Sequence, residues 1–163
     1  MVVLGIDPGF ATIGYGIVKK KGSIYMPIDY GVIKTSPKTS APQRFKQIYD
    51  SLEELIKKYK PDAIAIEELF FNRNAKSLIN VAQSRGVSIL AAIIYCGNIY
   101  EYTPLQIKQG LTGYGRAEKH QVQYMLKNLL GISDIPKPDD AADALAVAIT
   151  HLQTNQVLSG TKI

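Results

Sequence analysis

The first eighteen residues constrain the fold of this chain more than any other stretch. Val2 to Ile6 is an apolar run that ends at Asp7, and Pro8 and Gly9 then interrupt the pattern. A short run of Val, Ile and Leu bounded by Pro and Gly is typical of a strand buried on both faces. A carboxylate at the end of such a strand needs a metal ion, a cationic partner or hydrogen bonds, unless it simply caps the Pro-Gly turn. Both interpretations of Asp7 are open on this stretch alone.

Length and composition indicate one globular domain. The chain has 163 residues, of which 46% are hydrophobic and 20% charged, and its net charge is +5. A domain of this size buries about 68–70% of its unfolded surface without needing disulfides. The single cysteine, Cys96, lies in an apolar run and indicates a buried free thiol in a reducing compartment. The basic balance raises nucleic acid as a candidate partner.

We expect a cytoplasmic protein without a membrane partner. No basic segment precedes the first apolar run, so the N-terminus does not have the pattern of a signal peptide. The longest apolar run, near Ile89 to Cys96, is too short to span a bilayer. We expect the domain to cover residues 1–156 and the tail at 157–163 to be disordered, because no pattern continues there.

The first half of the chain predicts a mixed sheet. Strands at Ile13–Lys19 and about Ser23–Thr35, with Gly31 as a candidate bulge, would form an antiparallel meander with the first strand. A helix with one apolar stripe starts near Pro42. The short strand at Ala63–Ile66 follows it, and a strand–helix–strand crossover would lay this strand parallel to the first.

This topology would bring two carboxylates to one edge of the sheet. Asp7 and Glu67 end neighbouring parallel strands, and such strand ends are where α/β sheets bind ligands. The loop that follows contains Phe70, which either packs into the core or stacks on an exposed base. Arg73, in the same loop, is a candidate DNA contact.

The second half of the chain is expected to be mainly helical. The helix at Asn74–Tyr95, interrupted near Gly86, is apolar on two faces, which favours a partial dimer interface. A fifth strand is expected at Ile99–Tyr102. Helices at Pro104–Leu111 and Ala117–Leu130 then flank a glycine-rich loop. The cations around this loop are either solvated surface groups or DNA contacts: Lys108, Arg116 and Lys119.

The last helix begins with three aspartates. Asp140 and Asp143 are i,i+3 neighbours, and Asp139 and Asp143 are i,i+4 neighbours, so spacing permits either pair on one face. One or two of them could cap the helix or favour its dipole. Three carboxylates on one turn repel each other unless a cation intervenes.

The candidate constellation is made of carboxylates alone. Asp7, Glu67, Asp140 and Asp143 offer only hard oxygen ligands, which suit Mg²⁺ or Mn²⁺ and disfavour zinc. Two such ions about 3.5–4 Å apart can clamp the attacking and leaving oxygens of a phosphodiester displacement. An acidic cluster in a basic chain therefore predicts a metal-dependent nuclease.

Several motifs together resemble the RuvC-type Holliday junction resolvases, a family of crossover junction endodeoxyribonucleases. The resemblance extends from Met1 to about Gln156, and its most specific part is the last motif combined with the first. The motifs are LGIDPG at 4–9, GYG at 14–16, AIEELF at 65–70, AEKHQVQ at 117–123 and DAADALAVAITH at 140–151.

The resemblance implies an RNase H-like α/β fold: a five-stranded mixed sheet, with three antiparallel strands and then parallel strands, flanked by helices on both faces. It implies a homodimer that nicks two opposed strands of a four-way DNA junction in recombination and repair, with Mg²⁺ or Mn²⁺ and two ions per site. Junction-migrating helicase proteins are implied partners. The family's metal-binding acids correspond to Asp7, Glu67, Asp140 and Asp143. Its DNA contacts correspond to Phe70, Lys108 and Lys119.

Two other functions compete with this one. An actin-like nucleotide-binding fragment would use Asp7, Pro8 and Gly9 as a phosphate loop, but such proteins need two related domains and this chain has no internal repeat. A non-catalytic junction-binding protein would not need the complete acidic set.

Overall fold

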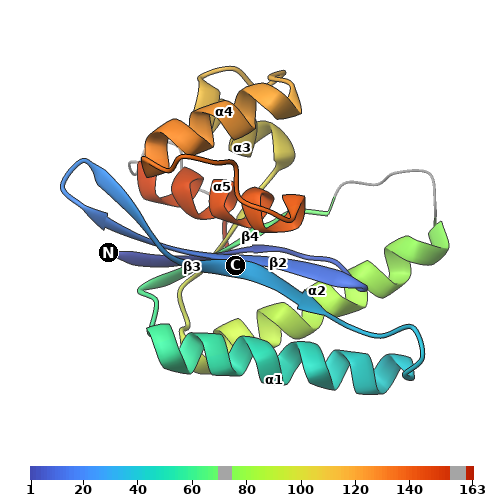
Figure 1. Ribbon diagram of the computed structural model, residues 1–163. Coiled ribbons are helices and arrows are strands. Elements are labelled where there is room, and N and C mark those ends of the chain that lie inside the picture. Colours follow the sequence, from blue (N-terminus) through green and yellow to red (C-terminus); the bar gives the residue numbers. More distant parts are fainter. Residues whose placement is uncertain (70–74, 155–160) are drawn as a thin grey trace.

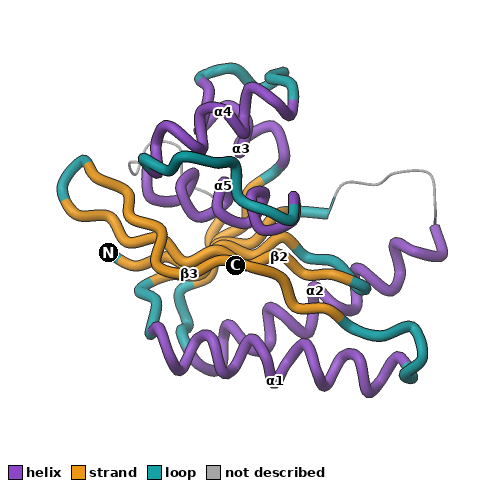
Figure 2. The backbone as a smooth tube through the Cα atoms, viewed as in Figure 1, coloured by secondary structure: helices purple, strands orange, loops and turns teal. Residues whose placement is uncertain are grey.

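The structure, a computed structural model, describes residues 1–69, 75–154 and 161–163, and its helices cover both faces of one sheet (Figure 1). The strands, in the spatial order β3-β2-β1-β4-β5-β6, are β1 (Val2–Asp7), β2 (Thr12–Lys21), β3 (Ile24–Lys34), β4 (Ala63–Glu67), β5 (Ile99–Tyr102) and β6 (Thr161–Lys162). The helices are α1 (Ala41–Tyr59), α2 (Ala75–Tyr95), α3 (Pro104–Thr112), α4 (Lys119–Leu130) and α5 (Asp139–Gln153). Helices α1 and α2 lie on one face, and α5 lies on the other beneath α3 and α4 (Figure 2).

The mixed topology confirms the prediction. Strand β1 pairs antiparallel with β2 and parallel with β4, so it is central. Because successive residues of a strand face opposite sides, β1 and β4 each contribute to two cores. Val3 and Ala65 face α5, whereas Leu4 and Ile66 face α1 and α2.

Three details differ from the prediction. Thr161 and Lys162 form a sixth strand that pairs antiparallel with β5, whereas residues 155–160 lie outside the described part of the chain. The bulge lies at Ile28, next to Pro27, because a proline cannot donate to the ladder. Helix α2 runs without interruption through Gly86.

Helix α5 packs against β1 and β2 at a distance that only glycine allows. A Cβ atom on Gly14 would lie 2.0 Å from the carbonyl oxygen of Asp140, and one on Gly5 would lie 2.0 Å from that of Ala144. A Cβ atom on Gly16 would lie 2.8 Å from the backbone nitrogen of Leu145. These glycines therefore set the height of α5 above the sheet, and Gly14 sets the height of its first turn.

We expect Gly14→Ala to lift the first turn of α5 and to lower the free energy of unfolding by about 3 kcal/mol, because the new methyl group would overlap backbone atoms. Urea unfolding measures this change. Gly86→Ala is the matched control when unfolding is measured on the monomer at low protein concentration, because a Cβ atom there meets nothing within 4 Å in the single chain. It should stabilise its helix by about 0.5–1 kcal/mol. Equal effects of the two substitutions would show that Gly14 does not limit the approach of α5.

Candidate active site

Asp7 and Glu67 leave the sheet side by side. Ile6 pairs with Ile66 in the parallel register, and each acid is the next residue along its strand. Strand alternation turns both acids toward α5, and both are half-buried. Glu68, by contrast, is exposed. The predicted meeting of two carboxylates at this edge therefore follows from the register.

Two helices anchor the loop that follows Asp7. The buried hydroxyl of Ser84 in α2 donates to the carbonyl of Gly9 at 2.5 Å. The guanidinium of Arg44 in α1 donates to the carbonyl of Phe10 at 3.2 Å and lies 3.5 Å from the centre of its ring. The buried Thr35 hydroxyl donates to the same carbonyl at 2.6 Å. These contacts hold the backbone beside Asp7 in place.

These anchoring residues were not predicted from the sequence, although the patterns of both helices contain a signal for them. Arg44 is the first member of the i,i+4 series that continues as Ile48, Leu52 and Ile56, so its position in the pattern is a core position. Ser84 is a hydroxyl residue with no exposed surface in a largely apolar helix. A polar side chain at a core position must find a partner, and here that partner is the loop after Asp7.

The first turn of α5 brings the remaining acids to the same edge. Gly14, which pairs with Asp7, lies directly under the backbone of Asp140. Asp143 follows one turn later, and its side chain is 38% exposed. The helix N-terminus favours negative charge at both positions.

Burial and mutual repulsion raise the pKa values of these acids. Burial, and then the charges of Glu67, Asp143 and Asp140, raise the pKa of Asp7 from 3.8 to about 8. Burial and the charge of Asp143 raise the pKa of Glu67 from 4.5 to about 7. Burial also raises the pKa of Asp143, although Lys119 opposes the shift. The site therefore holds more negative charge than its surroundings neutralise.

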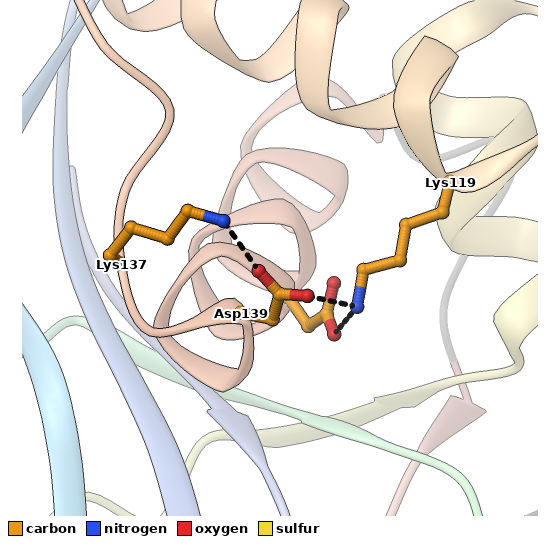
Figure 3. A network of polar contacts seen from close by, with 4 residues as sticks. Lys119, Lys137 and Asp139 are labelled. Carbon is orange, nitrogen blue, oxygen red and sulfur yellow. Dashed lines mark hydrogen bonds and ion pairs between the residues drawn. The ribbon is translucent and has the colours of Figure 1, made fainter.

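The ammonium group of Lys119 lies among these acids. Its Nζ lies 3.1 Å from Asp139 Oδ2 and 3.4 Å from Asp143 Oδ2, and Lys137 Nζ lies 3.1 Å from Asp139 Oδ1 (Figure 3). In the part of the chain that the structure describes, no three His, Cys, Asp or Glu side chains are close enough to hold an ion as they stand. Ion binding would therefore draw the acid side chains inward.

The donor set nevertheless fits a hard divalent cation. None of the described residues donates a hydrogen bond to the carboxylates of Asp7 or Glu67, and their raised pKa values show that their charges lack compensation. Oxygen-only ligands with uncompensated charge are what Mg²⁺ and Mn²⁺ require.

A cavity of about 260 Å³ opens beside the acids. Glu67 and Asp143 line it together with Lys108 and Lys119, and its remaining lining is Pro104, Ile107, Val122 and Ala146. The structure thus brings two predicted DNA contacts together with two predicted metal ligands. Arg116 is exposed and does not line this cavity.

Two predicted contacts and two larger cavities fall outside this arrangement. Phe70 and Arg73 lie outside the described residues. One larger cavity, of about 680 Å³, lies along α4 and has Tyr114 and Tyr124 in its wall, and another, of about 400 Å³, lies between the ends of α1 and α2. None of the four acids lines either of them. Cavity size alone would therefore have pointed away from the acids.

Comparisons with known proteins agree over the whole chain. The family model described as Crossover junction endodeoxyribonuclease RuvC matches residues 3–151. The protein of that name from Alkaliphilus metalliredigens is 58% identical over 163 residues, which cover 100% of this chain and 99% of the relative. The one from Caldanaerobacter subterraneus is 54% identical over 158 residues, which cover 97% of this chain and 96% of the relative.

A solved structure agrees with the fold. The structure of Thermus thermophilus RuvC in complex with Holliday junction substrate superimposes with a TM-score of 0.94 at 36% identity, covering 100% of this chain and 99% of that one. The similarity confirms the RNase H-like mixed sheet and the resemblance on which the expected functions depend.

We expect Asp7→Asn to stabilise the metal-free protein near pH 8 and to have little effect near pH 4. The folded-state pKa lies above the unfolded value, so folding takes up a proton between the two and stability falls as the pH rises through this window. The gain near the upper end should be on the order of 2–4 kcal/mol, since one pKa unit corresponds to about 1.4 kcal/mol.

Unfolding in EDTA at several pH values measures this difference. Asp50→Asn on α1 is the control for loss of a carboxylate, because Asp50 is half exposed on the opposite face of the sheet. A gain for Asp7→Asn that does not depend on pH would contradict the proposed burial of its charge.

Proposed function

This chain belongs to the RuvC family of crossover junction endodeoxyribonucleases, and we propose that it resolves four-way DNA junctions by paired symmetric nicks in recombination and repair. The observation that supports this most is the meeting of Asp7, Glu67 and the first turn of α5 beside a cavity with two lysines. Membership of this family excludes the alternative that the chain is an actin-like nucleotide-binding fragment. A non-catalytic junction-binding protein is the alternative that the cleavage assay below addresses.

We propose that Asp7, Glu67, Asp140 and Asp143 hold Mg²⁺, or Mn²⁺ in its place, with two ions per active site. When bound, such ions make water a stronger nucleophile and stabilise the departing 3′ oxygen. The chain's own contribution is to hold four carboxylates on rigid elements. The anchored loop after Asp7 and the glycine contacts under α5 limit how far these elements can move apart.

The proposed DNA contacts are the cations around the acids. Lys108 and Lys119 line the cavity with Glu67 and Asp143, so a phosphate placed against the acids would be within their reach. Arg116 is exposed in the loop between α3 and α4, and we propose that it contacts the DNA backbone at a greater distance from the acids. Phe70 is proposed as a contact on the family resemblance, and Arg73 because it is a cation three residues after Phe70 in the sequence.

We propose that a second copy of the chain covers α2. Four large apolar side chains of this helix are at least half exposed: Ile79, Leu90, Ile93 and Ile94. An exposed apolar face of this size is typical of an interface, and paired nicks on opposed strands require two active sites.

By length and composition, Leu78–Tyr95 could also cross a membrane. Two polar side chains within that segment instead bind it to the rest of the domain. Ser84 donates to Gly9, and Arg85 forms an ion pair with Glu101 at 2.6 Å. We therefore propose a cytoplasmic homodimer. Cooperation with junction-migrating helicase proteins is proposed from the family, and no residue described above identifies their binding surface.

We expect Glu67→Gln to reduce cleavage of a labelled four-way junction in Mg²⁺ by roughly 100-fold or more, because the loss of a metal ligand removes several kcal/mol of charge stabilisation. Junction binding should persist. Glu68→Gln is the matched control, since Glu68 is the adjacent residue and is exposed; its cleavage rate should stay close to that of the unmodified protein. If the unmodified protein binds the junction but does not cleave it in either Mg²⁺ or Mn²⁺, the nuclease proposal is wrong and the chain is a non-catalytic junction-binding protein.

Lys119→Ala and Lys108→Ala should each lower the slope of log affinity against log salt by about 0.9, as expected for one lost phosphate contact. The Asp7→Asn background allows this measurement in Mg²⁺, because that protein should bind the junction without cutting it. Lys46→Ala on α1 is the control, since Lys46 is exposed on the other face of the sheet. An unchanged slope would remove the substituted lysine from the DNA interface.

Ile94→Asp should weaken self-association by about 2 kcal/mol or more, because it buries a charge at the proposed interface. Sedimentation across a range of protein concentrations measures this. Ile24→Asp changes an equally apolar side chain that is 65% exposed on β3 and should leave association unchanged. A monomeric unmodified protein, or a dimer that Ile94→Asp does not weaken, would exclude α2 as the interface.

A further inference from the structure

The three aspartates at the start of α5 have different surroundings, and Asp139 differs most. Both of its carboxylate oxygens contact ammonium groups, Oδ2 with Lys119 and Oδ1 with Lys137, each at 3.1 Å (Figure 3). Its side chain is 48% exposed. Asp143 contacts the same Lys119 ammonium through one oxygen only and at the longer distance of 3.4 Å. Asp139 is therefore paired with two ammonium groups, whereas Asp143 has only Lys119, which it shares with Asp139.

We propose that Asp139 is a positioning residue that gives the Lys119 ammonium a second partner, so that a divalent cation can replace this ammonium at Asp143. The proposal rests on the proposed function, because it takes Asp143 as a metal ligand. It assigns to Asp139 a role that is distinct from coordination.

The geometry of α5 lets the Lys119 ammonium move away from Asp143 and stay bound to Asp139 over a short distance. Asp139 and Asp143 are separated by four residues, so they lie one turn apart on the same face of α5. Lys119 is the first residue of α4 and reaches both carboxylates through a flexible four-carbon side chain. The ammonium can thus leave Asp143 and keep Asp139 without movement of either helix.

The Lys119 ammonium and the divalent ion compete for the carboxylate of Asp143, and Asp139 affects the outcome. With Asp139 present, loss of the contact to Asp143 still leaves Lys119 ion-paired. Without Asp139, Asp143 is the remaining ion-pair partner of Lys119 among the residues that the structure describes. A divalent cation would then have to displace the lysine from its last partner. After displacement, Asp139 also keeps Lys119 at the rim of the cavity that Glu67 and Lys108 line.

Calorimetric titration of the metal-free protein with Mn²⁺, without DNA, tests this exchange in a thermodynamic cycle. Asp139→Asn should weaken Mn²⁺ binding by about tenfold, the size of effect typical of residues that support metal ligands. Lys119→Ala should tighten it severalfold, because a competing charge is removed. The double variant should bind like Lys119→Ala, because Asp139 acts only through the lysine.

The non-additivity separates positioning from a general effect of charge. If Asp139→Asn weakens binding by the same factor with and without Lys119, its charge simply attracts the ion and the proposal is wrong. No effect of Asp139→Asn would also overturn it. Asp50→Asn is the matched control, because Asp50 forms a similar exposed pair with Lys46 at 2.5 Å on the opposite face of the sheet. This control should bind Mn²⁺ like the unmodified protein.

Two further titrations distinguish failure of this proposal from failure of the proposed function. Asp7→Asn should abolish high-affinity Mn²⁺ binding if the acids form the metal site. If Asp7→Asn binds Mn²⁺ normally, the metal site itself is wrong and both proposals fall. If Asp7→Asn loses binding while the cycle is additive, only the role of Asp139 is wrong. Asp139→Glu should restore binding toward that of the unmodified protein, and failure to do so in a folded variant would argue against an ion-pairing role.

Discussion

The contact between α5 and the glycines of β1 and β2 is the constraint on which the rest of the site depends. A carbonyl oxygen of the helix lies only 2.0 Å from the place that a Cβ atom of Gly14 or Gly5 would take, so any residue larger than glycine would push the helix away from the sheet. This contact fixes the first turn of α5 over the end of β1, where Asp7 lies. Close packing of apolar and glycine surfaces thus provides the free energy that holds mutually repelling carboxylates together.

The acids make the protein less stable than an uncharged site would be. Burial and repulsion raise the pKa values of Asp7 and Glu67 to about 8 and about 7, which means that their ionised forms are unfavourable in the folded protein alone. Lys119 offsets part of this cost, but it is shared with Asp139 and is 54% exposed. A protein with such a site becomes more stable when a divalent cation binds, because a ligand that binds the folded state and not the unfolded state lowers the free energy of the folded state. The same imbalance that destabilises the protein favours metal binding.

Much of this arrangement could be predicted from the sequence. The apolar run before Asp7 and the crossover to Glu67 were enough to place both acids at one edge, because strand register and alternation follow from local patterns. Spacing alone could not choose between Asp139 and Asp140, since both share a helical face with Asp143, and only the family resemblance favoured Asp140. The roles of Gly14, Arg44 and Ser84 were not predicted, because they depend on contacts between elements that are distant in the sequence. The sixth strand was missed for a different reason: two residues after a stretch without pattern carry no periodicity.

The positions of the ions themselves decide whether these four acids form a metal site. Anomalous diffraction from crystals of the protein grown with Mn²⁺ and a four-way junction would show their positions. We expect two anomalous peaks per protomer, both within coordination distance of carboxylate oxygens from Asp7, Glu67, Asp140 and Asp143. A junction-bound protein with no peak at these acids, or with its Mn²⁺ held by Asp139 in place of Asp140, would contradict it.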